Sequence, residues 1–281
     1  MSDASENPTT QAWLSAVRGS ERRVMSSICT FENHGAYEVF KSEEFPKFYA
    51  GNGIAILQPS NDDIVHWVAV FHRHFSATQF RHLTLCFAED AWRDALAEQA
   101  EQAGFSQSIE VPLAAPAERL AGDGENEPST TTTRLLHSPT DMQALYRLHL
   151  DESRDLDWFI DDDDFKGLFA KTLAVSERVG ITWLGIDAPH GDGLISALGY
   201  FDHTGVCRLQ EIITAEPFRR KGLATRLIRD AATRATARGI GAVGLITELD
   251  SEAHSLYRRL GFVDLGREIT LMAYSRFAGG S

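Results

Sequence analysis

Residues 207–238 place a β-branched strand, a basic turn with a glycine and a long amphipathic helix in direct succession. In the helix, apolar side chains recur at steps of three and four residues and leave one face for the core. These side chains are Leu223, Leu227, Ile228, Ala231, Ala232 and Ala235. Gly239 follows them, and glycine commonly ends helices. Because such a helix must bury its apolar face on a neighbouring layer, the segment predicts an α/β architecture.

Alternating helical and strand-like patterns surround this segment and predict a mixed α/β sheet. Strands are expected near 131–136, 180–187, 194–202, 207–214 and 242–248, with a last strand pair after Phe262. Helices are expected near 141–150, 161–176, 219–238 and 251–259.

Composition narrows the class of protein. The chain has 281 residues, and its 43% hydrophobic and 24% charged residues are typical of a globular protein. A net charge of −13 disfavours nucleic acid as a partner, because phosphate backbones are repelled. No apolar run is long enough to span a membrane, and the three distant cysteines form no disulfide framework. We therefore expect no membrane partner and a cytoplasmic location.

A break in composition divides the chain at residues 114–130, where Pro, Gly, Glu and Ser crowd together without apolar periodicity. We expect an N-terminal domain over 1–115, a linker over 116–130 and a C-terminal domain over 131–281.

An offset of 157 residues lays the first domain over the second. Gly104-Phe105 then falls on Gly261-Phe262, and residues 52–60 fall on 209–217. This agreement in element order predicts two diverged copies of one fold.

The six residues Arg219 to Ala224 are the strongest candidate for a binding site. The first turn of a helix offers unpaired N–H groups and the positive end of the helix dipole, which together attract a polyanion. Gly222 lets phosphate oxygens approach the backbone, and the basic run adds Coulomb attraction. A pyrophosphate fits this place. The alternative is an ordinary helix start with a solvated basic cluster.

Two motifs resemble those of the GNAT acetyltransferase superfamily. Arg219-x-x-Gly222-x-Ala224 resembles its acetyl-CoA pyrophosphate signature, and residues 253–262 resemble its tyrosine-bearing helix. The resemblance covers residues 131–275. It implies two GNAT-like acyl-CoA N-acyltransferase domains in tandem, with acetyl-CoA as acyl donor and an active C-terminal copy. Under the 157-residue offset, Asp62, Val65 and Trp67 replace the signature, so the N-terminal copy is expected to be degenerate.

The resemblance also implies a role for each matching residue. Ile212, Ile213 and Thr214 would contact the pantetheine arm. The pyrophosphate would be held by Arg219, Arg220, Lys221, Gly222, Leu223 and Ala224. Tyr257 would protonate the leaving thiolate, or it merely packs.

Two acidic residues complete the implied site. Glu211 would be the general base, unless its side chain points to solvent on the alternating face of the strand. Asp250 stands where the family often has an asparagine that contacts pantetheine, and it would alternatively cap the following helix.

Residues 151–167 are rich in acids and carry Trp158 and Phe159, which suits a cationic acceptor. Asp161–Asp164 would alternatively cap the next helix. The expected function is acetyl transfer to the primary amine of a small molecule or peptide by direct attack in a ternary complex. The alternative is a non-catalytic acyl-CoA sensor or interaction protein. Acceptor identity and oligomeric state stay open.

Three histidines of the first domain, His72, His74 and His82, invite a metal interpretation. On a helix, residues two apart point away from a shared ion, and no supporting cysteine or carboxylate motif is evident. We therefore expect no metal site.

Overall fold

The computed structural model describes residues 8–46, 48–58, 63–76, 82–122, 132–154, 161–189, 191 and 193–274. The chain divides into two compact units, and neither is a continuous stretch of sequence. The large unit comprises residues 1–23, 112–246 and 252–265. The small unit comprises residues 24–111, 247–251 and 266–281. No helix in the described part of the chain is long and apolar enough to cross a membrane.

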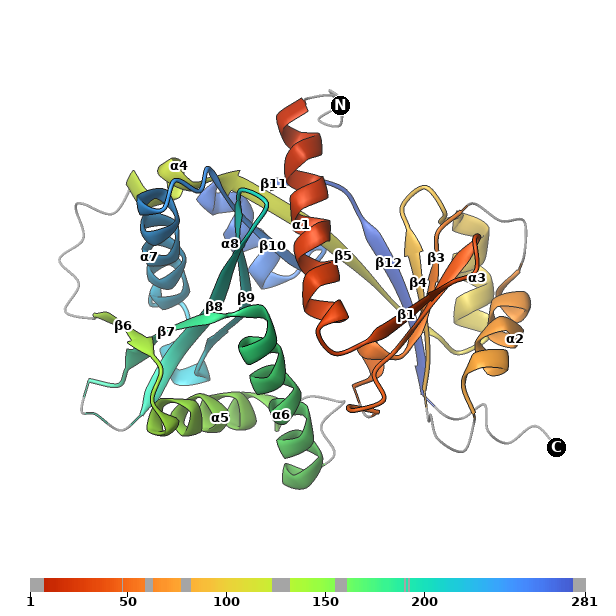
Figure 1. Cartoon of the computed structure of the whole chain (residues 1–281), viewed down its shortest axis with the longest axis horizontal. Coiled ribbons are helices and arrows are strands. Elements are labelled where there is room, and N and C mark those ends of the chain that lie inside the picture. Colours follow the sequence, from red (N-terminus) through yellow and green to blue (C-terminus); the bar gives the residue numbers. More distant parts are fainter. Residues whose placement is uncertain are drawn as a thin grey trace. The chain divides into compact units, whose positions relative to one another are not determined.

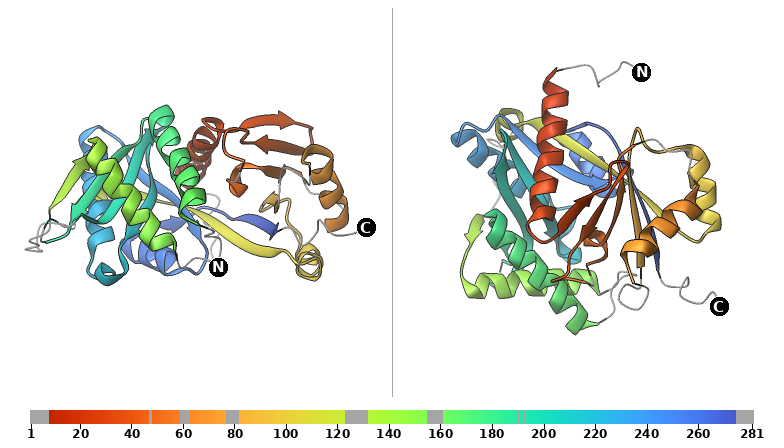
Figure 2. Two further views of the ribbon diagram at one scale, coloured as in Figure 1. Left: turned by 90° about the horizontal axis from the view of Figure 1, so that it is seen from below. Right: turned by 45° about the vertical axis from the view of Figure 1, so that its right-hand side comes forward.

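The small unit is a sheet with two helices in one core. Its elements are β1 (Thr30–Asn33), β2 (Tyr37–Lys41), η2 (Tyr49–Gly51), β3 (Gly53–Ile56), α2 (Ile64–His74), β4 (His82–Ala88), α3 (Asp94–Gln102), the first half of β5 (Ser106–Pro116) and β12 (Glu268–Tyr274). The strand order is β1-β2-β3-β4-β12-β5, and β3 pairs with β4 in parallel. Trp67 and Phe71 of α2 share a core cluster with Leu96 of α3, and Figure 2 shows both helices on one side of these strands.

The large unit repeats this plan with more helices (Figure 1). Its elements are α1 (Pro8–Ser26) through Arg23, the second half of β5, α4 (Ala117–Gly122), β6 (Thr133–Leu136), α5 (Pro139–Ser153), α6 (Asp162–Val179), β7 (Thr182–Asp187), β8 (Leu194–His203), β9 (Val206–Thr214), η3 (Glu216–Phe218), α7 (Leu223–Ala237), β10 (Ala242–Glu248), α8 (Glu252–Leu260) and β11 (Val263–Asp264). The strand order is β6-β7-β8-β9-β10-β5, and β11 pairs with β5. The β9–β10 pair is parallel, whereas β6–β7, β7–β8, β8–β9 and β11–β5 are antiparallel.

Helix α7 confirms the predicted core face, because its buried residues are the six expected from periodicity. Gly239 ends the helix with φ +77°, and its N–H donates to the Thr236 carbonyl. The start differs from the prediction. The helix begins at Leu223, and residues 219–222 form the turn before it.

The element order predicted from the 157-residue offset is present in both units. In the large unit β9, α7, β10, α8 and β11 follow one another, and in the small unit β3, α2, β4, α3 and β5 do so. The mixed α/β sheet and the duplicated plan are therefore confirmed.

Two strands exchange between the copies. In the small unit, β12 lies between β4 and β5, although residues 268–274 follow the second copy in sequence. In the large unit, the second half of β5 takes the matching place between β10 and β11. The predicted strand pair after Phe262 is therefore wrong, because β11 and β12 each pair with other strands.

The structural units also differ from a division at a single linker. Residues 117–122 form helix α4 rather than linker, and residues 123–131 lie outside the described residues. The first helix groups with the large unit and β12 with the small unit. Sequence composition does not report such long-range pairing.

Candidate active site

The candidate site begins where β9 leaves its parallel neighbour. β9 pairs with β10 from Val206 to Arg208, whereas β9 continues to Thr214. On its other edge β9 carries a bulge, since Ala197 faces Ile213 and Gly199 faces Gln210. Bulges bend a strand and re-aim its side chains. The register thus shows that β9 departs from β10 after Arg208 and bends at the bulge.

Glu211 lies in the bulge with φ +51°, a left-handed conformation that is uncommon for a residue other than glycine. Its side chain is 37% exposed, so the carboxylate reaches solvent without being fully exposed. One oxygen lies 3.9 Å from Nδ1 of His149, a residue of α5 that the sequence analysis did not single out.

His149 is buried between aromatic rings of Phe169 and Trp183, at centroid distances of 5.8 and 6.3 Å. Burial lowers its pKa, and the charge of Glu211 opposes this effect. Its Nε2 has no hydrogen-bond partner among the described residues. The side chain is therefore a neutral imidazole at pH 7. Only the fold, through α5, brings it to Glu211.

The end of β9 is held by neighbouring side chains. Ser196 Oγ donates to the Ile213 carbonyl at 2.8 Å and lies 2.8 Å from Thr214 Oγ1. Arg219 Nε donates to the Thr214 carbonyl at 3.1 Å. A carbonyl oxygen has two lone pairs, so the Thr214 carbonyl can accept from a ligand as well as from Arg219. Ile212 is the third residue expected here, and it lies within the bulge.

Gly222 forms an open start to α7. It is the residue before the helix, with φ +77°, and it makes no side-chain cap. A Cβ at this position would meet nothing within 4 Å. The N–H groups of Leu223 and Ala224 belong to the uncapped first turn, where helix amides lack intrahelical partners. Such a turn can accept an anion.

The three basic residues before Gly222 differ in their surroundings. Arg219 pairs with Glu152 of α5, whose other oxygen accepts the Glu216 N–H at 2.9 Å. Arg219 thus fastens the turn to α5 and is less free to contact a phosphate than expected. Arg220, with φ +61°, makes an exposed ion pair with Glu252 at 3.1 Å. Lys221 Nζ lies 4.9 Å from the Phe218 ring centroid.

Tyr257 of α8 is buried, with 7% of its surface exposed. Burial raises its pKa to about 12, and the charge of Arg208 partly opposes this. Its ring lies 5.8 Å from that of Phe262. The hydroxyl is therefore protonated at neutral pH and can act as a donor.

Arg208 is a second residue that sequence reasoning missed. It is 5% exposed, and its guanidinium pairs with Glu21 of α1 at 2.7 Å. Nothing in the local pattern of β9 distinguishes this arginine, because its partner is 187 residues away.

Asp250 does not cap α8. The helix begins at Glu252, so Ser251 holds the position before it, and Ser251 Oγ donates back to the Glu248 carbonyl. Asp250 has φ +61° and belongs to the small-unit segment 247–251. Asp250 stands two residues before Glu252, the partner of Arg220, and its contact with pantetheine stays a prediction.

The acidic acceptor segment is only partly described, because residues 155–160, with Trp158 and Phe159, lie outside the described residues. Asp161 accepts the Phe165 N–H through its carbonyl, and Asp162, the first residue of α6, pairs with Arg154 at 3.1 Å. These positions fit the first-turn alternative for the Asp161–Asp164 run.

The corresponding helix start in the small unit is closed. The Asp63 carboxylate precedes α2 and accepts the His66 N–H at 2.9 Å. Val65 is 69% exposed and Trp67 is buried, while Asp62 lies outside the described residues.

Comparison with known proteins identifies the class. Residues 138–262 match the model of the Acetyltransferase (GNAT) family, and this segment is a GNAT domain. A search of curated proteins gave no significant match.

Solved structures show the same fold over nearly the whole chain. A functionally unknown conserved protein from Staphylococcus epidermidis is 14% identical with a TM-score of 0.74, covering 86% of this chain and 92% of that one. A GCN5-related N-acetyltransferase from Kribbella flavida is 17% identical with a TM-score of 0.60, covering 95% and 96%. A tandem GNAT protein from the clavulanic acid biosynthesis pathway is 13% identical with a TM-score of 0.53, covering 99% and 97%. The chain therefore has the fold of two GNAT domains in tandem.

Proposed function

We propose that the large unit is an acetyl-CoA-dependent N-acetyltransferase that acetylates a primary amine. The observation that carries this proposal is the open start of α7 at Gly222, directly after a strand that departs from its parallel neighbour. The uncapped amides of the first turn would hold the pyrophosphate, and Arg220 and Lys221 would add positive charge. The gap that β9 leaves beside β10 would admit the pantetheine arm next to Ile212, Ile213 and Thr214.

Transfer would proceed by direct attack in a ternary complex. The amine nitrogen forms a bond to the acetyl carbonyl carbon as the carbon–sulfur bond breaks. Tyr257 would give its proton to the departing thiolate. Its raised pKa makes it a weaker acid than a free phenol. A buried thiol also has a raised pKa, so the two groups shift in the same direction.

Glu211 would take the proton that the amine loses, through water, because its carboxylate reaches solvent at the bulge. His149 is neutral and lies 3.9 Å from that carboxylate, beyond direct hydrogen-bond distance. The role of base would fall to the residue expected from sequence.

The acceptor would be the amine of a small molecule or a peptide. A chain with net charge −13 attracts cations at long range, and Asp161 and Asp162 lie at the start of α6 in the same unit. These charges favour a cationic acceptor without selecting one.

Two measurements test this function. Calorimetry should detect acetyl-CoA binding to the full chain, and thiol release should appear when a panel of amines and peptides is added. Glu211→Gln should lower kcat by about 10²-fold or more with little change in acetyl-CoA affinity. Glu216→Gln, at an exposed carboxylate of η3, is the matched control and should stay near wild type. Binding without thiol release for any amine would favour an acyl-CoA sensor instead.

A further inference from the structure

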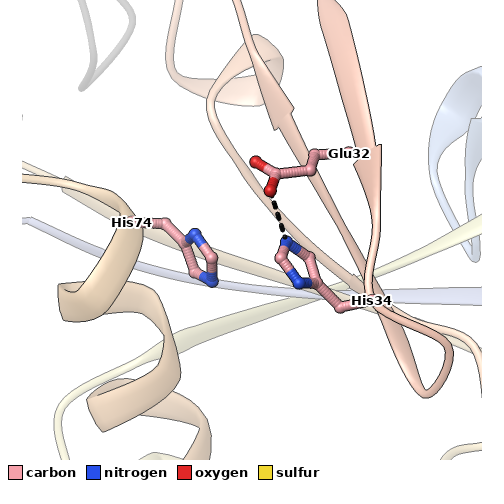
Figure 3. A group of neighbouring side chains, drawn as sticks. All are labelled: Glu32, His34 and His74. Atoms are coloured by element: carbon pink, nitrogen blue, oxygen red, sulfur yellow. Dashed lines mark ion pairs between the residues drawn. The ribbon is translucent and has the colours of Figure 1, made fainter.

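Three potential metal ligands meet in the small unit, and none of them is assigned to acetyl transfer. Glu32 lies in β1, His34 follows that strand, and His74 ends α2 (Figure 3). One ligand atom from each lies within 4.8 Å of the others. We propose that this cluster binds a divalent transition-metal ion such as Zn²⁺.

Local structure explains why the first two ligands project together. Glu32 lies in β1 and His34 is the first residue after it, and their side chains meet, with His34 Nε2 3.3 Å from Glu32 Oε1. A tight turn holds His34, because its N–H donates to the Tyr37 carbonyl at 2.9 Å. Gly35 completes the turn with φ +82°, and its N–H donates to the Asn33 side chain at 2.7 Å. The backbone that carries both ligands is thus well defined.

Tyr37 contacts both imidazoles. Its ring stacks on His34 with centroids 4.8 Å apart and an angle of 12° between the planes. Its hydroxyl lies 3.2 Å from Nε2 of His74. Groups that restrict the rotation of ligating histidines usually surround metal sites, and here one side chain does so for two rings.

The donor set suits a borderline-soft ion. Two imidazole nitrogens and one carboxylate form a common Zn²⁺ set that leaves positions for water. Ligands bonded at about 2.0–2.2 Å in a tetrahedron lie about 3.3–3.6 Å from one another. His34 Nε2 and Glu32 Oε1 are already 3.3 Å apart. To complete a tetrahedral set, the His74 ring must move closer to the other two ligands. The exposed Glu32 side chain can shift to meet it.

The positive charge near the cluster opposes the binding of a cation, so the Glu32 carboxylate is needed to compensate it. Lys41 and Arg73 place positive charge near His74, whereas Glu32 supplies negative charge. A cation there would depend on Glu32 for charge compensation as well as for a bond. This predicts that replacing Glu32 by its neutral isostere weakens binding as strongly as removing an imidazole.

The test uses the full chain without a histidine tag, stripped with a chelator and titrated with Zn²⁺ by calorimetry. One ion should bind per chain. His74→Ala and Glu32→Gln should each weaken that binding by at least about tenfold. His72→Ala is the matched control, since His72 is exposed in the same last turn of α2 and should stay within about twofold.

A second readout separates lost ligation from lost folding. The unfolding midpoint of each metal-free variant should equal that of the metal-free wild type, while Zn²⁺ should raise the midpoint of wild type and His72→Ala alone. Failure of the wild type to bind Zn²⁺ at millimolar concentration would overturn the proposal. Equal binding by folded His74→Ala would overturn it too. Neither result depends on the acetyltransferase activity.

Discussion

The starts of α7 and α2 occupy the same place in the two copies, but only α2 has a side chain that caps its first amides. In the large unit, Gly222 precedes α7, takes a left-handed conformation and offers no side-chain acceptor. In the small unit, the Asp63 carboxylate accepts the His66 N–H of α2. A helix start that caps itself has no need of an external anion and repels one. The duplicated fold thus retains a candidate phosphate site only where the chain leaves its own amides unpaired.

The two copies are also expected to differ in catalysis, and Tyr257→Phe has the largest expected effect. It removes a proton donor from the large unit without changing packing volume, so kcat should fall about 10²–10⁴-fold while acetyl-CoA affinity stays nearly constant. Tyr49→Phe in the small unit is the control and should retain wild-type kcat. Less than a threefold fall in Tyr257→Phe across the pH range would mean that this tyrosine only packs.

The open helix start is tested next by Gly222→Glu, which gives α7 a carboxylate like that of α2. We expect acetyl-CoA affinity to drop by at least about tenfold, because the new charge competes for the first-turn amides. Gly239→Glu is a matched control at the other end of the helix. Both glycines have φ +77° and open space around a Cβ, so backbone strain is shared. Equal losses in both variants would point to strain rather than to a lost anion site.

The reciprocal change, Asp63→Ala, should act on stability alone. Loss of a helix cap costs about 1 kcal/mol, which corresponds to about 2–4 °C in the unfolding midpoint of a chain of this size. Acetyl-CoA calorimetry should be unchanged. Weaker acetyl-CoA binding in a variant that stays folded would place part of the donor site in the small unit.

Buried histidines in both units should make the stability of the chain depend on pH, and this is the smallest of the expected effects. Burial lowers the pKa of His149 in the large unit and of His82 in the small unit. In the unfolded chain both histidines take up protons near their usual pKa of about 6.5, which the folded chain resists, so stability should fall as pH drops below this value. His149→Gln should flatten the dependence of the unfolding midpoint on pH between 7 and 5. An unchanged slope would show that His149 is as easily protonated in the folded chain.

Local features of this protein could be predicted from sequence, and remote partners could not. The buried face of α7 and its stop at Gly239 follow from periodicity and backbone freedom within one helix. Glu152, which fastens Arg219, and His149, beside Glu211, reach the candidate site only when α5 folds against β9. Their sequence separation from those partners is more than 60 residues, and no local pattern marks them.

The sequence-based expectation of no metal site considered the histidines of one domain without the fold around them. Consideration of His72 and His74 on one helix rightly gave no shared ion. The sequence does carry a signal, Glu32-x-His34 at strand spacing, but it acquires meaning only beside His74.

The exchange of β5 and β12 also sets the order in which this protein can fold during synthesis. Residues 24–111 leave the ribosome early, yet the strand between β4 and β5 of the small unit is residues 268–274. Until these emerge, the facing edges of β4 and β5 have no partner, and unpaired edges invite pairing with other chains. The first copy therefore lacks one of its strands until the second copy has been translated.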